Sequence, residues 1–205
     1  MKKKHEELAD RFSQMATDYD DKQHNDEYNA CASLVIDHAD PRPDDVVLDL
    51  GTGTGLIALA LAENAEHVVG RDISEGMLEK ARAKADDGSI DNVEFGDGEF
   101  RDPQYDGEVD IVVSNFAMHH LPDEEKREAI EVIASLSPRR FVLGDAMFFG
   151  SPNPEEPLFG HGVDAATVGL LVDELTDAGF VVTAVERVHD QVGVLVAERL
   201  EIPQK

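Results

Sequence analysis

The sequence predicts an α/β fold, a doubly wound sheet of seven mostly parallel strands that ends in an antiparallel hairpin. Three observations predict it. An apolar run at 46–50 leads directly into a glycine loop at 51–55 and an alanine- and leucine-rich helical segment at 56–62. Further short apolar runs alternate with helix-like segments along the chain, as in parallel sheets. The last two runs, 180–188 and 192–197, are separated by a short turn, which predicts the hairpin.

The other elements follow from hydrophobic periodicity and from turn residues. Ser74 is a good N-cap for a helix that follows it. The loop at 150–162 holds three prolines and three glycines. It either contributes to substrate specificity, with Phe148, Phe149, Phe159 and His161 as its walls, or is a plain surface connection. We expect helices within 2–18, 28–36, 123–136 and 167–178, and strands at 68–72, 93–95, 109–115 and 141–149.

A chain of 205 residues is long enough for one buried α/β domain. We expect residues 1–40 to form a helical lid or lead-in and residues 41–205 to form the main unit of this single domain. No apolar run approaches ~18 residues, so no membrane span is predicted. The basic residues at 1–4 precede an acidic segment instead of an apolar one, and Cys31 is the only cysteine. These features predict a cytoplasmic protein without a signal peptide or a disulfide framework.

Acidic residues outnumber basic ones along the whole chain. There are 44 Asp and Glu against 18 Lys and Arg, which gives a formal net charge of −26. Dense carboxylates keep a protein hydrated at high salt, where ions screen their repulsion, and an acidic surface can also bind a basic partner. The even spread of the acids favours the first interpretation and a halophilic archaeal source. The same charge opposes nonspecific binding to nucleic-acid phosphates.

The glycine loop does not match the common nucleotide-binding fingerprints. The dinucleotide motif G-x-G-x-x-G needs a third glycine where this chain has Leu56, and the Gly-Lys-Ser/Thr of a P-loop is absent. Two acids accompany the loop instead: Asp49 lies inside the first strand and Asp72 ends the second. A carboxylate roughly 20 residues beyond such a loop can bind both hydroxyls of a ribose.

These segments resemble the S-adenosylmethionine-binding motifs of the class I (Rossmann-like) methyltransferases. The resemblance is carried by Asp49–Gly55, Asp72-Ile73-Ser74 and Gly96-Asp97, and it extends in the family's order from about Tyr19 to the C-terminus. It implies an enzyme that uses S-adenosylmethionine and releases S-adenosylhomocysteine. The segment Phe12–Asp20 is similar to the lead-in that folds over the cofactor in small-molecule members, which implies a small-molecule acceptor.

The resemblance assigns roles position by position. It implies that Asp49 orients the loop and the cofactor ammonium, that Asp72 binds the ribose, and that Ile73 packs on the adenine. It also implies that Asp97 accepts a hydrogen bond from the adenine amino group. Tyr19 touches the methionine end or belongs to a docked surface helix. The implied cofactor-binding residues are Tyr19, Asp49, Gly51, Thr52, Gly53, Gly55, Asp72, Ile73, Met77, Asp97, Gly98, Glu99 and Ser114.

The segment 114–121 is similar to the one that lines the donor methyl group in small-molecule members. It lacks the Asn/Asp-Pro-Pro-aromatic motif of many enzymes that methylate amines of bases or glutamine amides. His120 can take a proton from the acceptor, because the pKa of histidine lies near neutrality; holding the backbone at the helix entry is its alternative role. Asp145 is the second catalytic candidate, with loop capping as its alternative. No residue cluster has convincing metal-ligand spacing, so we expect no metal.

Two other functions stay open at this stage. The chain can bind the cofactor or its product without catalysis, as a sensor or partner subunit, and only turnover separates that function from an enzyme. A nucleotide-dependent oxidoreductase is disfavoured by Leu56. Among acceptors we rank a small molecule first, followed by a quinone precursor, a lipid and RNA. The sequence does not indicate the oligomeric state.

Overall fold

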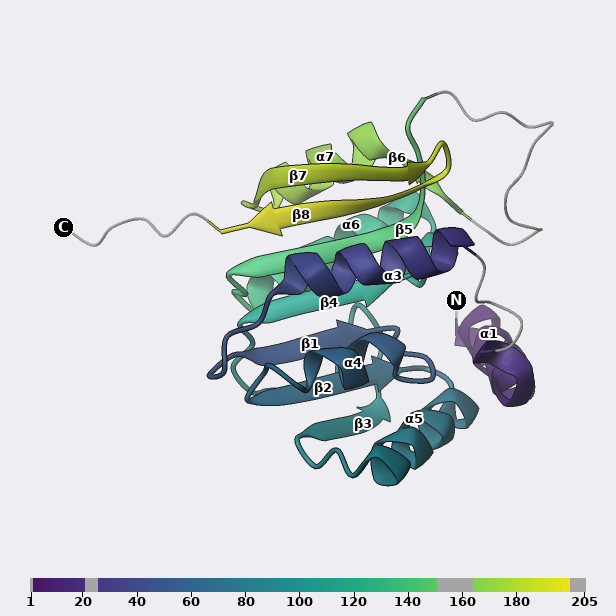
Figure 1. Ribbon diagram of the computed structural model, residues 1–205. Coiled ribbons are helices and arrows are strands. Elements are labelled where there is room, and N and C mark those ends of the chain that lie inside the picture. Colours follow the sequence, from purple (N-terminus) through teal and green to yellow (C-terminus); the bar gives the residue numbers. More distant parts are fainter. Residues whose placement is uncertain (1, 21–25, 151–163, 200–205) are drawn as a thin grey trace.

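The computed structural model describes residues 2–20, 26–150 and 164–199 (Figure 1). Its sheet confirms the predicted α/β architecture, with the strand order β3-β2-β1-β4-β5-β8-β7. The first five of these strands run parallel, and β8 is antiparallel to both β5 and β7. The strands are β1 (Val46–Leu50), β2 (His67–Asp72), β3 (Val93–Asp97), β4 (Ile111–Asn115), β5 (Arg140–Phe148), β7 (Val181–His189) and β8 (Val192–Glu198).

Helices cover both faces of the sheet. Figure 1 shows α3 (Asp26–Ala39), α4 (Leu56–Leu61) and α5 (Glu75–Gly88) on one face, and α6 (Asp123–Ser135) and α7 (Val168–Asp177) on the other. Each helix buries an apolar stripe against the sheet, as doubly wound folds require. In the part of the chain that the structure describes, no helix is long and apolar enough to cross a membrane.

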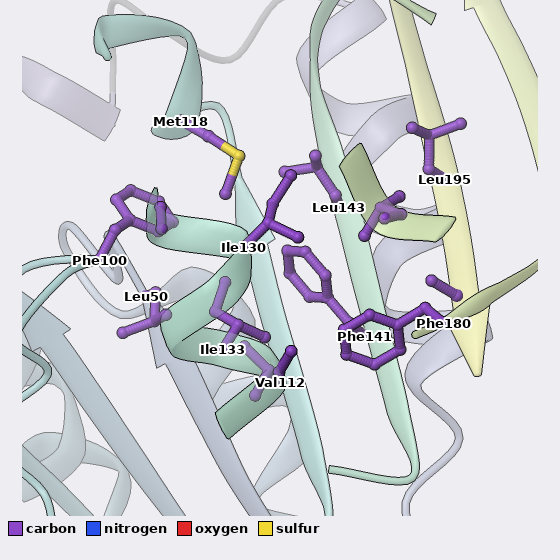
Figure 2. Packing of buried hydrophobic residues seen from close by; sticks show 14 of the residues in the cluster. Leu50, Phe100, Val112, Met118, Ile130, Ile133, Phe141, Leu143, Phe180 and Leu195 are labelled. Atoms are coloured by element: carbon purple, nitrogen blue, oxygen red, sulfur yellow. The ribbon is translucent and has the colours of Figure 1, made fainter. Parts of the chain in front are cut away.

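Successive side chains of a strand point to opposite faces of the sheet, so the core consists of two clusters, one on each face. Leu50 of β1 packs with Ile130 of α6 on one side of the sheet (Figure 2), in a cluster that also includes Leu48. Val47, which precedes Leu48, packs with Ile57 of α4 on the other side. All five side chains are at most 4% exposed, so β1 is buried on both faces. Burial of β1 fixes the position of the glycine loop that follows it.

The prediction missed one short element. Strand β6 (Ala166–Thr167) pairs with the end of β5 in parallel, and Thr167 then caps α7 by accepting a hydrogen bond from the Leu170 N–H. Two residues are too few to show a strand period in sequence. The predicted candidates Phe159 and His161 lie outside the described residues.

The N-terminal helix lies at the edge of the sheet where the parallel strands end. Figure 1 shows α1 (Lys2–Met15) beside the arrowheads of β1, β2 and β4. The Ser13 hydroxyl lies 2.9 Å from the Ser74 hydroxyl and accepts a hydrogen bond from the Gly76 N–H (3.3 Å). A Cβ at Gly76 would lie 2.8 Å from the Ser13 backbone, so glycine permits this close approach. The division into a lid (1–40) and a main unit (41–205) stays a prediction.

Candidate functional site

A pocket opens at the carboxyl ends of β1, β2 and β4, and α1 lines part of it. This is the edge where doubly wound sheets bind their ligands. Leu8 and Phe12 of α1 contribute to its wall, so the N-terminal segment takes part in the site. The predicted site residues that line it are Tyr19, Asp49, Gly51, Thr52, Gly53, Asp72, Ile73, Met77, Gly98, Glu99 and His120.

The glycine loop turns through backbone conformations that favour glycine. Gly51, Gly53 and Gly55 have φ angles of 74°, 55° and 84°, all in the left-handed region. A Cβ at Gly51 would overlap the Cβ of Ala117, whereas a Cβ at Gly53 would meet nothing within 4 Å. The loop therefore packs tightly at its start and leaves open space at Gly53, on the wall of the pocket.

Asp72 links this loop to the next helix. Its Oδ2 accepts a hydrogen bond from the Gly53 N–H (2.8 Å), and its Oδ1 accepts one from the Ser74 N–H (2.9 Å). Burial raises the pKa of Asp72, and backbone hydrogen bonds from Ser74, Gly53 and Ile73 oppose the rise. The carboxylate thus shapes the cofactor-free site as well as offering lone pairs to a ligand.

Asp49 is a buried carboxyl group in the floor of the pocket. It is 1% exposed, and its Oδ2 accepts a hydrogen bond from the Thr52 hydroxyl (2.7 Å). Burial raises its pKa to about 7; the Thr52 hydrogen bond opposes the rise and the charge of Asp72 adds to it. A cationic ligand group beside Asp49 would stabilise the ionised form.

Four predicted site residues do not reach the pocket wall. Gly55 packs in the loop below it, and Ser114 is fully buried in β4. Asp97 is the last residue of β3 and has an exposed side chain, whereas the next two residues do line the pocket. Asp145 lies on β5 beneath the short helix η2 (Met118–His120), where it contacts His119.

Asp145 holds the segment that presents His120 to the pocket. Its carboxylate accepts hydrogen bonds from the His119 N–H (3.0 Å) and the Ala146 N–H (2.7 Å), and its Oδ1 lies 2.5 Å from His119 Nδ1. The ring of His119 in turn lies against that of His120, with 4.0 Å between centroids. These contacts favour the capping alternative for Asp145, because its carboxylate holds the turn at His119 from the side of β5.

Removing the Asp145 carboxylate should therefore destabilise the protein. Asp145→Ala breaks three hydrogen bonds, one of them to the buried ring of His119, which we expect to cost roughly 3–5 kcal/mol and to lower Tm by about 10 °C. Thermal unfolding measures the change, with the exposed Asp173→Ala of α7 as the matched control. A Tm within ~2 °C of wild type would contradict the assigned role.

The N-terminal segment is also tied to the glycine loop. The carboxylate of Asp20 accepts a hydrogen bond from the Thr54 hydroxyl (2.6 Å) and pairs with Lys84 Nζ (2.6 Å). Burial, followed by the charges of Asp72 and Asp20, raises the pKa of Tyr19 to about 12. The Tyr19 phenol therefore stays protonated at neutral pH as a hydrogen-bond donor on the pocket wall.

The sequence prediction missed Tyr28 as a pocket residue, although it placed Asn115 and Phe116 in a segment at the site. Tyr28 of α3 and Phe116, which follows β4, stack with 5.2 Å between ring centroids, and all three residues line the pocket. Tyr28 is far from the other two in sequence, and the packing of α3 against β4 and β5 brings them together. Within the ranges that the structure describes, no group of three His, Cys, Asp or Glu side chains could hold a metal ion.

Comparisons with known proteins agree with this geometry. A family model described as a methyltransferase domain matches residues 47–138. An uncharacterized methyltransferase of Bacillus pumilus is 33% identical over 150 residues, which cover 69% of this chain and 68% of that protein. The chain belongs to the methyltransferase family. A second methyltransferase, from Geobacillus sp., is 35% identical over 146 residues, 70% of this chain and 66% of its own. The chain thus spans about two-thirds of these relatives' length.

The fold of this methyltransferase is shared with solved enzymes. The crystal structure of magnesium protoporphyrin IX methyltransferase from Synechocystis, with bound S-adenosylmethionine, matches it with a TM-score of 0.73 and 23% identity over 96% of this chain and 97% of that chain. This likeness confirms the Rossmann-like methyltransferase fold. The two sequence relatives are bacterial, so they do not support a halophilic archaeal source, which stays a prediction.

Proposed function

We propose that this methyltransferase binds S-adenosylmethionine in the pocket and methylates a small molecule. One observation carries the proposal: the glycine loop, Asp49 and Asp72 converge on a single pocket at the carboxyl edge of the sheet. The cofactor bound to the Synechocystis enzyme, which has the same fold, supports the choice of ligand.

The residues of the pocket fit this cofactor. Asp49 and Asp72 are carboxylates that suit a ligand with a positive sulfur and an ammonium group. Each Asp72 oxygen accepts one backbone hydrogen bond and keeps further acceptor capacity for ribose hydroxyls. Ile73 and Met77 offer apolar surface to the adenine, and the open space at Gly53 lets a ligand approach the main chain.

The chain's own contribution to the reaction is alignment and proton transfer. When bound, the cofactor supplies a methyl group activated by the positive charge on sulfur. Residues of α1 and the segment after it cover the pocket, which restricts the acceptor's orientation and the access of water. We assign His120 as the group that receives the acceptor's proton, because its ring lines the pocket and is held between Phe12 and His119.

The test is methyl transfer from labelled S-adenosylmethionine to a panel of uncharged phenols, amines and thiols in molar KCl. Labelled product with at least one of them, and stoichiometric S-adenosylhomocysteine, is the expected result. Cofactor binding without any transfer, to the panel or to a small-molecule cell extract, would favour the sensor or partner-subunit alternative. The methyltransferase relatives favour the enzyme.

His120→Ala should lower turnover by roughly 10²- to 10⁴-fold, the usual contribution of a general base. Cofactor affinity should stay within about threefold, since His120 is assigned to the acceptor and not to the cofactor. The measurement is kcat against pH for an acceptor from the panel, with Kd from calorimetry as the control. Unchanged turnover would leave His120 with only its role of holding the helix entry.

We also propose that the net charge of −26 is an adaptation to high salt. Repulsion among the carboxylates should destabilise the folded chain where counterions are dilute. The melting temperature should therefore rise by roughly 10 °C between ~0.1 M and molar KCl, where the screening length falls from ~10 Å to ~3 Å. Equal melting temperatures would refute the adaptation and favour a surface for a basic partner.

A further inference from the structure

One wall of the pocket is built mainly from aromatic rings. We call Phe12, Tyr28, Asn115, Phe116 and His120 the acceptor wall; all five line the pocket. Tyr28 and Phe116 stack at 5.2 Å with 24° between ring planes, and Phe12 meets His120 edge-on at 5.2 Å. Walls of this kind bind flat rings through offset-stacked and edge contacts.

The fold holds Phe116 on this wall against a conformational cost. Its φ of 52° lies in the left-handed region, which costs a residue with a Cβ roughly 1–2 kcal/mol. The Phe116 N–H donates to the Gly144 carbonyl (2.8 Å), which extends the β4–β5 pairing beyond the strand and fixes the turn. Strain of this kind concentrates at ligand sites.

Asn115 supplies an unusual polar group at the same place. The residue is 8% exposed, and neither its side-chain Nδ2 nor its Oδ1 has a hydrogen-bond partner among the described residues. A Cβ at Gly144 would lie 2.6 Å from Oδ1, so the glycine makes room for the amide. A buried amide without a partner costs roughly 1–3 kcal/mol per group, and native proteins rarely keep one without a reason. A ligand that both donates to and accepts from this amide would remove the cost.

The charges of the pocket select against an anionic ligand. Among its described lining residues, Arg101 is the only Lys or Arg, and its guanidinium lies 3.3–3.9 Å from Glu99, Glu125 and Glu128. Asp49 and Asp72 are assigned to the cofactor and offer no positive group to an acceptor. An anionic acceptor would therefore find no uncommitted guanidinium or ammonium group among the described lining residues to pair with.

We infer that the acceptor is an uncharged aromatic molecule whose polar substituent pairs with the Asn115 amide. This inference rests on the proposed function, because it assigns the acceptor wall relative to a bound cofactor. The rings provide contact area, Asn115 provides the directional hydrogen bonds, and the acidic lining excludes acids.

Three small probes test the inference by calorimetry and ligand-observed NMR on the full chain saturated with S-adenosylhomocysteine. Benzamide carries a neutral ring and an amide, benzoate carries the same ring with a negative charge, and cyclohexanecarboxamide carries the same amide without an aromatic ring. Benzamide should bind roughly tenfold more tightly than either of the others. Equal binding of benzoate, equal binding of cyclohexanecarboxamide, or no binding of benzamide would overturn the inference.

Asn115→Leu removes the amide while keeping the number and branching of the side-chain heavy atoms. The substitution should weaken the binding of benzamide roughly tenfold and leave the affinity for S-adenosylhomocysteine unchanged. Tm should stay the same or rise, because an unpaired buried amide is lost. A lower affinity for S-adenosylhomocysteine together with an unchanged affinity for benzamide would place Asn115 in the cofactor site instead. Phe116→Gly, which suits the left-handed backbone, is the second variant and should abolish the preference for benzamide over cyclohexanecarboxamide. Failure of S-adenosylhomocysteine to bind wild type would instead refute the proposed function.

Discussion

Asp49→Asn should weaken S-adenosylmethionine binding by roughly 10- to 100-fold at about pH 8 and, at the same time, raise the melting temperature of the cofactor-free protein. The loss of affinity follows because the variant no longer presents a carboxylate to the cationic ligand. The gain in stability follows because ionised Asp49 is buried and the Thr52 hydroxyl that donates to it is neutral, a hydrogen bond that asparagine can keep.

The pH dependence of stability has a definite sign at this residue. In the unfolded chain the Asp49 carboxyl loses its proton near 3.8, whereas burial raises its folded pKa to about 7. Between these values the folded state binds more protons, so this group's contribution to the free energy of unfolding falls as pH rises and is lost above about pH 7. The difference in Tm between variant and wild type should therefore be near zero at pH 4 and reach roughly 5 °C at about pH 8.

Binding should show the same titration. Below about pH 7, Asp49 of the wild-type protein must release a proton before it can pair with a cation. The wild-type affinity for S-adenosylhomocysteine should therefore fall up to tenfold for each unit that the pH is lowered, whereas the affinity of Asp49→Asn should not change with pH. Calorimetry of S-adenosylhomocysteine between pH 5.5 and 7.5 measures both. Parallel curves for the two proteins would show that Asp49 does not face the bound cation.

Asp72→Ala has the second large expected effect. Loss of charge-assisted hydrogen bonds to ribose should cost on the order of 1–3 kcal/mol of cofactor affinity. The structure adds a second consequence, because Asp72 also accepts hydrogen bonds from the Gly53 and Ser74 N–H groups. Tm of the cofactor-free variant should fall by roughly 5 °C as the glycine loop loses this anchor.

The matched control removes the same charge elsewhere. Asp91 is exposed just before β3, at the opposite end of that strand from the pocket. Asp91→Ala should leave both affinity and Tm close to wild type. If Asp72→Ala behaves like this control in calorimetry, the assignment of the ribose to Asp72 is wrong; an unchanged Tm alone would remove only its role in the loop.

The glycine-loop side of the pocket could be predicted because the residues that build it are contiguous in sequence. A buried strand, three glycines with left-handed backbone and a helix follow one another from Val46 to Leu61, and Ser74 caps the next helix as expected. Local chemistry decides these features, so the sequence shows them directly. Asp72 also lies next to the glycine loop in the fold, as its spacing in the sequence predicts, because β1 and β2 are neighbouring strands.

The aromatic side of the pocket could be predicted only in part: the sequence indicated segment 114–121, but the partners of that segment depend on which strands become neighbours. The contact between His119 and Asp145 requires β4 to lie beside β5, and the stack of Tyr28 on Phe116 requires α3 to cover that pair. Arg71 is buried because the loop after β3 folds over it, where the Pro103 carbonyl accepts its Nε–H (3.1 Å). Asp97 ends β3 with an exposed side chain beside two residues that line the pocket, so its role toward the adenine stays a prediction.

Calorimetric titration of S-adenosylmethionine, S-adenosylhomocysteine and NADPH into the protein in molar KCl tests the central claim most directly. We expect micromolar binding of the first two and none of NADPH, because the glycine loop and two carboxylates suit a cationic nucleoside and Leu56 replaces the third dinucleotide glycine. Binding of NADPH in preference to S-adenosylmethionine, or no binding of either S-adenosyl compound to a folded sample, would contradict it.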